Sequence, residues 1–213
     1  MKKIMFSDRF GMTQAVKDEI KNNTRRVAKD ICHSLVSHVS ELHNIEVGRD
    51  GFTITYSTGV RQHVFPAYQV GEEVAVAQSY KVTAQYSRKW LDLQLAANAQ
   101  NIGDLFDSGG WENKMYVSAY YCPLRIRITN IRFERLQDIS NEDCLREGIH
   151  RVRISGKAFS RPVTCYTFNG DTKPMPTYMT PKEAFAALID EINGKGTWEK
   201  NPWVFVYEFE LVK

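Results

Sequence analysis

One stretch of the chain, residues 125–135, reads RIRITNIRFER and alternates apolar with polar side chains more regularly than any other segment. Alternation with a period of two is typical of a β-strand that buries one face. Ile126 and Ile128 face the core in this interpretation, and the arginines face solvent or a groove. The alternation changes phase near Asn130, which predicts a β-bulge at that position. We therefore expect a long, half-buried strand with a local kink.

Two helix starts follow this strand. Ser140 is the expected N-cap of a short helix, and Asp143 stands three residues later, as in a capping box. Thr180 is the expected N-cap of a longer helix, because Pro181 suits the first helical position and Glu183 completes the box. The expected elements on this side of the strand are a helix ending at Gly148, β-like runs within 150–178, a helix from 181 to about 192, and a closing strand over 203–212.

The residues before the strand predict a mixture of short strands and helices. The expected elements are a strand over 3–6, a helix over 13–20 with Thr13 as its N-cap, a helix over 27–42, a hairpin over 51–56 and 60–65, a turn and strand over 68–77, a helix over 87–105, and a strand over 115–119. They lack the regular strand–helix–strand rhythm of a parallel sheet. We therefore expect an α+β fold with a mixed or antiparallel, barrel-like sheet and flanking helices.

The composition is that of a soluble globular protein. Of the 213 residues, 43% are hydrophobic and 25% are charged, which are ordinary values for a chain with a full-sized core. That length favours one domain with insertions. The formal net charge of +3 permits an anionic partner without requiring one, because dedicated nucleic-acid modules are usually more basic.

Neither the cysteines nor the histidines indicate a metal site. The four cysteines form no CxxC pair and have no histidine at metal-ligand spacing. His33, His38 and His43 are five residues apart, so they would not share one face of a helix. We expect no metal, no cofactor, and reduced, mostly buried thiols.

The sequence contains no apolar run that would direct it to a membrane. The N-terminal residues lack the apolar core of a signal peptide, and no stretch approaches ~18 consecutive apolar residues. We therefore expect a cytoplasmic protein with no membrane partner. Nothing in the sequence predicts an oligomeric state.

A basic segment near the N-terminus, residues 21–26, reads KNNTRR and contains the pattern Lys-x-x-Thr-x-Arg. It is followed in order by a Gly-hydrophobic strand at 71–76, ITNI at 128–131, LQDIS to EG at 136–148, and an aromatic closing strand at 204–209. This order of motifs resembles the ASCH domain family of the PUA-like superfamily, in its large bacterial and phage members. The resemblance implies a single PUA-like domain over 1–213, with insertions at about 27–65, 80–113 and 150–178. The family often has Gly two residues before the lysine, where this chain has Glu19.

By motif matching, the resemblance implies functional roles for Lys21, Thr24 and Glu147. Some small ASCH proteins use a Lys, a Thr and a Glu to remove the acetyl group from N4-acetylcytidine, and other members bind RNA or modified bases without cleaving them. We therefore expect a basic cleft that binds RNA or a modified nucleoside. The alternative is a metal-independent amidohydrolase with Thr24 as nucleophile, Lys21 as its base and Glu147 as proton shuttle.

Four further residues are candidates for ligand binding. Arg25 and Arg26 are expected to bind the ligand, and Arg26 is the candidate for holding an oxyanion or a phosphate. Trp111 and Lys114 stand in a Gly-rich loop that could close over the cleft, with Trp111 stacked on a base. The alternative for Trp111 is a structural plug at one end of a barrel.

Structural interpretations of the same residues stay open from sequence alone. The cations of residues 21–26 would suit the C-terminal end of the first helix, and Thr24 would suit the N-cap of the next helix. Glu147 would suit a surface pair with Arg151 or a neighbouring lysine. A non-catalytic interaction protein is a third class, and it would show an exposed apolar patch without a cleft. The hydrolase hypothesis requires Lys21, Thr24 and Glu147 to lie within hydrogen-bond reach of one another.

Overall fold

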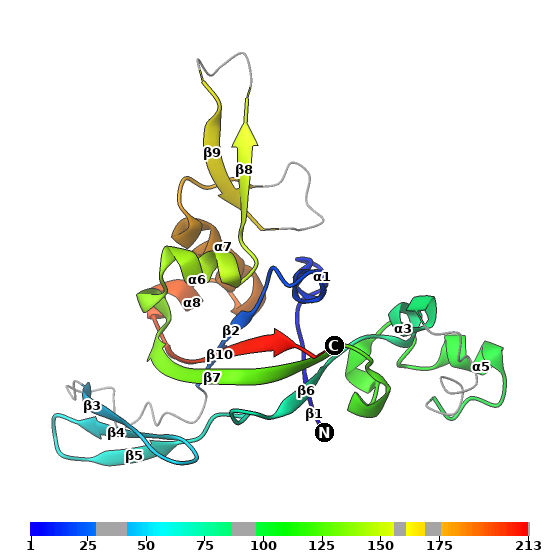
Figure 1. The fold of residues 1–213 in the computed structure, drawn as a ribbon, viewed down its shortest axis with the longest axis horizontal. Helices are drawn as coiled ribbons and strands as arrows, with labels where there is room; N and C mark the ends of the chain where they lie inside the picture. Colours follow the sequence, from blue (N-terminus) through cyan, green and yellow to red (C-terminus); the bar gives the residue numbers. More distant parts are fainter. Residues whose placement is uncertain (29–41, 87–96, 156–160, 169–175, 213) are drawn as a thin grey trace.

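The computed structural model describes residues 1–28, 42–86, 97–155, 161–168 and 176–212, and its largest sheet has five strands in the order β1-β6-β7-β10-β2 (Figure 1). β1 pairs with β6 in parallel, and the other neighbours are antiparallel, so the sheet is mixed. The strands are β1 (Lys2–Ile4), β2 (Asn23–Val27), β6 (Glu73–Val76), β7 (Arg125–Arg135) and β10 (Trp203–Leu211).

The five-stranded sheet is open. Within the described residues, β1 and β2 are its two edges and do not pair with each other, whereas a barrel gives every strand two neighbours. The predicted α+β class is confirmed, because helices and two smaller sheets accompany this mixed sheet. The predicted closure into a barrel is not seen in the described part of the chain.

β7 is the predicted alternating strand, and it lies at the middle of the sheet. Ile126 and Ile128 are fully buried, as the alternation predicted. β10 pairs with Ile128 and then with Asn130, so that Thr129 has no partner and forms a bulge next to the expected position. A bulge adds one residue to one strand and bends it, which explains why the apolar alternation changes phase there.

The two predicted helix starts are confirmed. In α7 (Pro181–Asn193), Thr180 Oγ1 accepts a hydrogen bond from the backbone of Glu183, whose carboxylate accepts one from the backbone of Thr180. In α6 (Asn141–Arg146), Ser140 Oγ accepts from the backbone N–H of Asp143 at 3.0 Å. The side chain of Asp143 does not complete a box, because arginines bind it instead.

α7 packs against the sheet through residues at helical spacing. Its buried side chains are Pro181, Ala184, Phe185, Leu188 and Ile189. Full burial of one such apolar side chain stabilises the fold by about 1.5–3 kcal/mol. The remaining helices near this core are α1 (Met12–Lys17), η3 (Leu136–Asp138) and α8 (Thr197–Lys200).

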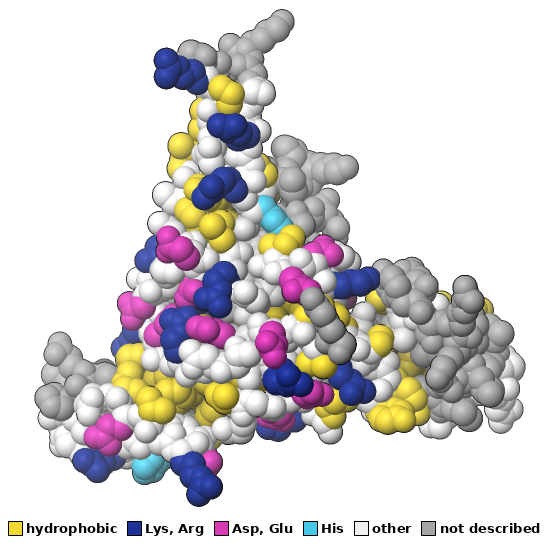
Figure 2. All heavy atoms as spheres, in the orientation of Figure 1, with side chains coloured by type: hydrophobic (Ala, Val, Ile, Leu, Met, Phe, Trp, Pro, Cys, Tyr) yellow, Lys and Arg dark blue, Asp and Glu magenta, His cyan; other side chains and the backbone are white. Residues whose placement is uncertain are grey.

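Three groups of elements leave the central sheet in different directions (Figures 1 and 2). The first is a three-stranded sheet of β3 (Leu42–Val47), β4 (Phe52–Tyr56) and β5 (Arg61–Val64), which contains the predicted hairpin. The second is a hairpin of β8 (His150–Ile154) and β9 (Val163–Thr167). The third is a helical group of α3 (Tyr80–Tyr86), α5 (Ile102–Asp107), η1 (Lys114–Tyr116) and η2 (Ala119–Tyr121).

Several local predictions were wrong or lie outside the described residues. The strand expected over 115–119 is a pair of short 3-10 helices, and α1 begins after Gly11 rather than with Thr13 as its cap. The helix expected over 27–42 is wrong at both ends, since Val27 belongs to β2 and Leu42 begins β3. Its middle, with His33 and His38, lies outside the described residues, as does 87–96 of the helix expected over 87–105.

The described cysteines are buried thiols. Cys122, Cys144 and Cys165 are free and buried, and burial raises the pKa of Cys144 to about 12. A thiol with such a pKa stays protonated near neutral pH and is a poor nucleophile. No helix in the described ranges has the length and apolar character needed to cross a bilayer.

Candidate functional site

The basic segment 21–26 leads into an edge strand. β2 pairs antiparallel with β10, with Thr24 opposite Tyr207 and Arg26 opposite Phe205. The interpretations of Thr24 as a helix cap and of this segment as the end of a helix are therefore wrong. Side chains at alternate positions of a strand point to the same side of the sheet. The side chains of Thr24 and Arg26 therefore lie on the same side of β2.

Lys21 and Glu147 form a buried ion pair although 126 residues separate them in sequence. Lys21 Nζ donates to Glu147 Oε2 at 2.5 Å and to the Glu147 backbone carbonyl at 2.8 Å. Each side chain is about 95% buried. Glu147 follows the last turn of α6, and Gly148 adopts a positive φ of 100° that ends the helix there. The pairing of Glu147 with a surface arginine is therefore wrong.

Burial lowers the pKa of Lys21. Desolvation disfavours the ammonium form, and the cations Arg26 and Arg25 act in the same direction, while Glu147 opposes them. The net direction is downward. The environment of Lys21 therefore shifts it toward the neutral amine that a general base requires.

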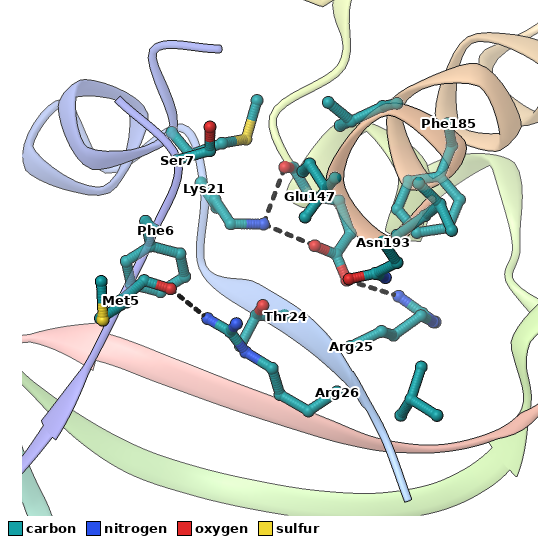
Figure 3. A pocket seen from close by; sticks show the side chains of 15 residues that line it. Met5, Phe6, Ser7, Lys21, Thr24, Arg25, Arg26, Glu147, Phe185 and Asn193 are labelled. Atoms are coloured by element: carbon teal, nitrogen blue, oxygen red, sulfur yellow. Dashed lines mark hydrogen bonds and ion pairs between the residues drawn. The ribbon is translucent and has the colours of Figure 1, made fainter. Parts of the chain in front are cut away.

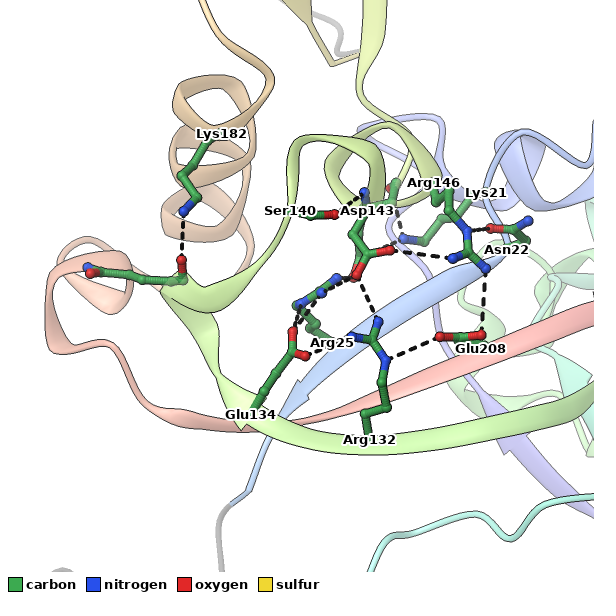
Figure 4. A network of polar contacts seen from close by, with 12 residues as sticks. Lys21, Asn22, Arg25, Arg132, Glu134, Ser140, Asp143, Arg146, Lys182 and Glu208 are labelled. Carbon is green, nitrogen blue, oxygen red and sulfur yellow. Dashed lines mark hydrogen bonds and ion pairs between the residues drawn. The ribbon is translucent and has the colours of Figure 1, made fainter. Parts of the chain in front are cut away.

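The second carboxylate oxygen of Glu147 accepts a hydrogen bond from Arg25. Arg25 also belongs to a network with Glu134, Asp143 and Arg132 (Figure 4). Arg25 donates to Glu147 Oε1 at 3.1 Å, to Glu134 at 2.7 Å and to Asp143 at 2.9 Å. Arg132 also binds Asp143, at 2.8 Å. Burial raises the pKa of Asp143, but hydrogen bonds from Arg132 and Arg25 outweigh it, and the net pKa lies below the ordinary value. This network fixes Glu147 against Lys21.

A cavity of about 290 Å³ opens beside the ion pair (Figure 3). Lys21, Thr24, Arg26 and Glu147 all line it, and Figure 3 shows Lys21 and Glu147 on one side, with Thr24 and Arg26 rising from β2. The other lining residues are Met5, Phe6, Ser7 and Met12 from the N-terminal segment, Arg25 and Val27 from β2, and Phe185, Leu188, Ile189, Ile192 and Asn193 from α7.

Two polar groups at this cavity have no hydrogen-bond partner within the part of the chain that the structure describes. Arg26 donates through Nη2 to the Met5 carbonyl at 2.5 Å, but its buried Nε has no hydrogen-bond partner among the described residues. The Thr24 hydroxyl likewise makes no hydrogen bond to any group in the described ranges, although the residue is only 5% exposed. The ring of Phe6 makes cation–π contacts with two cations. Lys21 Nζ lies 5.6 Å and the Arg26 guanidinium 5.5 Å from the ring centroid.

The structure brings five of the seven predicted site residues together at this cavity. Trp111 is not one of them, since its ring packs edge-on against Phe106 at 4.6 Å in a separate apolar cluster. Lys114 forms an ion pair with Asp8 at 2.7 Å and donates to the Phe6 carbonyl. It therefore supports the backbone behind the cavity without lining it, and the predicted lid of Trp111 and Lys114 does not lie there.

Sequence reasoning missed the walls of the cavity. Phe6 and Ser7 follow a short strand without any distinguishing motif, and only packing brings them to β2. The apolar spacing of Phe185, Leu188 and Ile189 predicts one buried helix face, but nothing local says that this face covers Lys21.

The described residues offer no metal-binding cluster of three or more His, Cys, Asp or Glu side chains. Comparisons with protein-family models, with curated proteins and with solved structures find no match for this chain.

Proposed function

We propose that the chain is a PUA-like domain of the ASCH type, and that the cavity beside β2 binds a modified nucleoside, free or within RNA. The observation that carries the proposal is the buried Lys21–Glu147 pair in the wall of a cavity that also presents Thr24 and Arg26. The motif matching that underlies the ASCH resemblance singles out Lys21, Thr24 and Glu147 as well. The five-stranded sheet would then be the core of the PUA-like fold.

The chemistry of the cavity suits a flat, polar ligand. The unpartnered Nε of Arg26 can donate to a carbonyl or phosphate oxygen, and a buried donor without a partner costs ~1–3 kcal/mol that such a ligand would recover. Phe6 and the apolar residues of α7 offer surfaces for the faces of a base. About 290 Å³ lies at the lower end of ligand pockets, which start near ~300 Å³, so one nucleoside fits better than several nucleotides.

A calorimetric titration with cytidine and N4-acetylcytidine tests the binding proposal. Arg26→Met should weaken binding at least about tenfold, since a hydrogen bond to a charged group is worth ~1.5–3 kcal/mol. Arg49→Met is the matched control, because Arg49 is exposed in the turn between β3 and β4 and does not line the cavity. Absence of binding by the wild-type protein would overturn the proposal.

A second candidate function is hydrolysis of the N4-acetyl amide, and the lowered pKa of Lys21 beside the partner-free Thr24 hydroxyl favours it. Neutral Lys21 would take the Thr24 proton as Oγ1 bonds to the acetyl carbon, with Arg26 stabilising the oxyanion. The C–N bond then breaks, and the proton passes through Glu147 to the leaving amine. Water cleaves the acetyl–Thr24 ester, which releases acetate and restores the hydroxyl.

Thr24 makes no hydrogen bond to Lys21 or Glu147 within the described residues, so these three side chains do not form a hydrogen-bonded triad in this structure. Catalytic hydrogen bonds often tighten only when substrate is bound. Chromatography after incubation with N4-acetylcytidine should show cytidine and acetate from the wild type and from Thr24→Ser, and none from Thr24→Ala or Lys21→Met. If the protein binds N4-acetylcytidine but forms no cytidine, the binding proposal stands and the hydrolase hypothesis is wrong.

A further inference from the structure

One segment of the chain is basic and contains no acidic residue. Residues 148–170 contain Arg151, Arg153, Lys157 and Arg161 and no Asp or Glu. These four charges exceed the formal net charge of +3, so the rest of the chain carries a net charge of −1.

This segment forms a two-stranded arm that projects from the body (Figure 1). β8 and β9 pair antiparallel from His150 opposite Thr167 to Ile154 opposite Val163. Figure 2 shows Lys and Arg side chains spaced along the visible face of the arm. Lys157 lies outside the described residues, so the structural argument rests on the arginines.

The three arginines of the arm are exposed and have no acidic partner. Within the described part of the chain, no carboxylate pairs with Arg151, Arg153 or Arg161. Arg127 and Arg132 on the central sheet differ from them, since each binds at least two carboxylates. Charges that are not neutralised within the chain attract an anionic partner.

The base of the arm is anchored in the core. The ring of Phe168 packs edge-on against Phe10 at 5.6 Å and stacks with Tyr178 at 6.2 Å. Tyr166 and Tyr178 exchange two backbone hydrogen bonds of 2.8 Å. These contacts attach the base of the arm to the core.

We propose that the β8–β9 arm binds double-stranded DNA, with the ribbon in the major groove and its arginines on the flanking phosphates. A major groove of ~12 Å width and ~8.5 Å depth admits a two-stranded β-ribbon, and five-residue strands are ~17 Å long. The major groove of double-stranded RNA is too deep and narrow for such a ribbon. The proposal rests on the arm alone and is independent of the ligand in the β2 cavity.

Fluorescence anisotropy with a labelled 20-base-pair DNA duplex tests whether the arm binds DNA. The triple variant Arg151→Gln/Arg153→Gln/Arg161→Gln should bind at least tenfold more weakly than wild type. The slope of log K against log salt should fall by up to about 3 units, because each phosphate contact contributes ~0.9. Each single variant should show a part of the same loss.

The control variant Arg49→Gln/Lys195→Gln/Lys200→Gln removes three exposed charges from the body of the protein. It should retain binding within about threefold of wild type. Equal losses in both triple variants would overturn the proposal, as would binding of a matched RNA duplex as tight as that of DNA.

Discussion

The charge network around Asp143 and the β8–β9 arm use arginine in opposite ways. In the network, Arg25 is almost fully buried and binds Glu134, Asp143 and Glu147. On the arm, the arginines are exposed and lack carboxylate partners within the described ranges. The comparison separates charge that holds the protein together from charge that is available to a partner.

The energetics of the two regions should differ accordingly. A buried pair gains little over apolar packing, but loss of one partner leaves an uncompensated charge and is strongly destabilising. An exposed charge without a partner contributes little to the free energy of unfolding. Four predictions test this difference, in order of expected size.

Glu147→Ala should have the largest effect on stability. It removes the carboxylate shared by Lys21 and Arg25, and breaking a buried pair costs ~3–5 kcal/mol. Urea unfolding measures the loss. Lys21→Met should cost less, because Glu147 keeps Arg25 as its partner. A loss under ~1 kcal/mol for Glu147→Ala would show that the network does not stabilise the fold.

Lowering the pH should have the second-largest effect on stability, because it weakens the charge network around Asp143. The pKa of Asp143 lies below its ordinary value near 3.8, because arginine hydrogen bonds outweigh the effect of burial. Its stabilisation is therefore complete above that value and is lost as the pH falls through the lowered pKa. Urea unfolding between pH 6 and about pH 2 should show a steeper acid loss in wild type than in Asp143→Asn, by up to ~1.5–3 kcal/mol. Parallel curves would contradict the prediction.

Arg132→Gln should cost less than either change. Its side chain is 38% exposed, although it binds Glu134, Asp143 and Glu208. Partly solvated pairs are typically worth ~0.2–1 kcal/mol and weaken with salt. Urea unfolding of wild type and Arg132→Gln in low and in high salt measures the stability loss and its dependence on salt. A loss that is large and independent of salt would mean that Arg132 acts as a buried member of the network.

The arm variant Arg151→Gln/Arg153→Gln/Arg161→Gln should have the smallest effect on stability. Exposed substitutions away from packed features usually change the free energy of unfolding by no more than ~0.5 kcal/mol each. Thermal unfolding by circular dichroism should therefore give a melting temperature close to that of wild type. A marked decrease would show that the arm arginines stabilise the body, and the distinction between the two regions would fail.

Some elements were predictable because their signals are local. The alternation of residues 125–135 predicted β7 and its bulge, and Thr180, Pro181 and Glu183 predicted the start of α7. The family resemblance singled out Lys21, Thr24 and Glu147, which the structure places at one cavity. Its implication for catalysis stays a prediction.

The strand β2 was not predictable from its own residues. The sequence NTRRV contains Asn and two arginines, residues that local reasoning assigns to a turn or a helix end. It becomes a strand because β10 pairs with it and because acids from β7 and α6 neutralise Arg25. The deciding interactions come from residues more than one hundred positions away.

The sequence by itself determined the α+β class, the central strand, and the caps of α6 and α7. Tertiary structure alone decided that the sheet stays open, that Lys21 is buried against Glu147, and that the arm projects with its arginines exposed. The physical reason is range. Hydrophobic period and capping act within a few residues, whereas the pairing of strands and buried charges depends on which distant segments share the core.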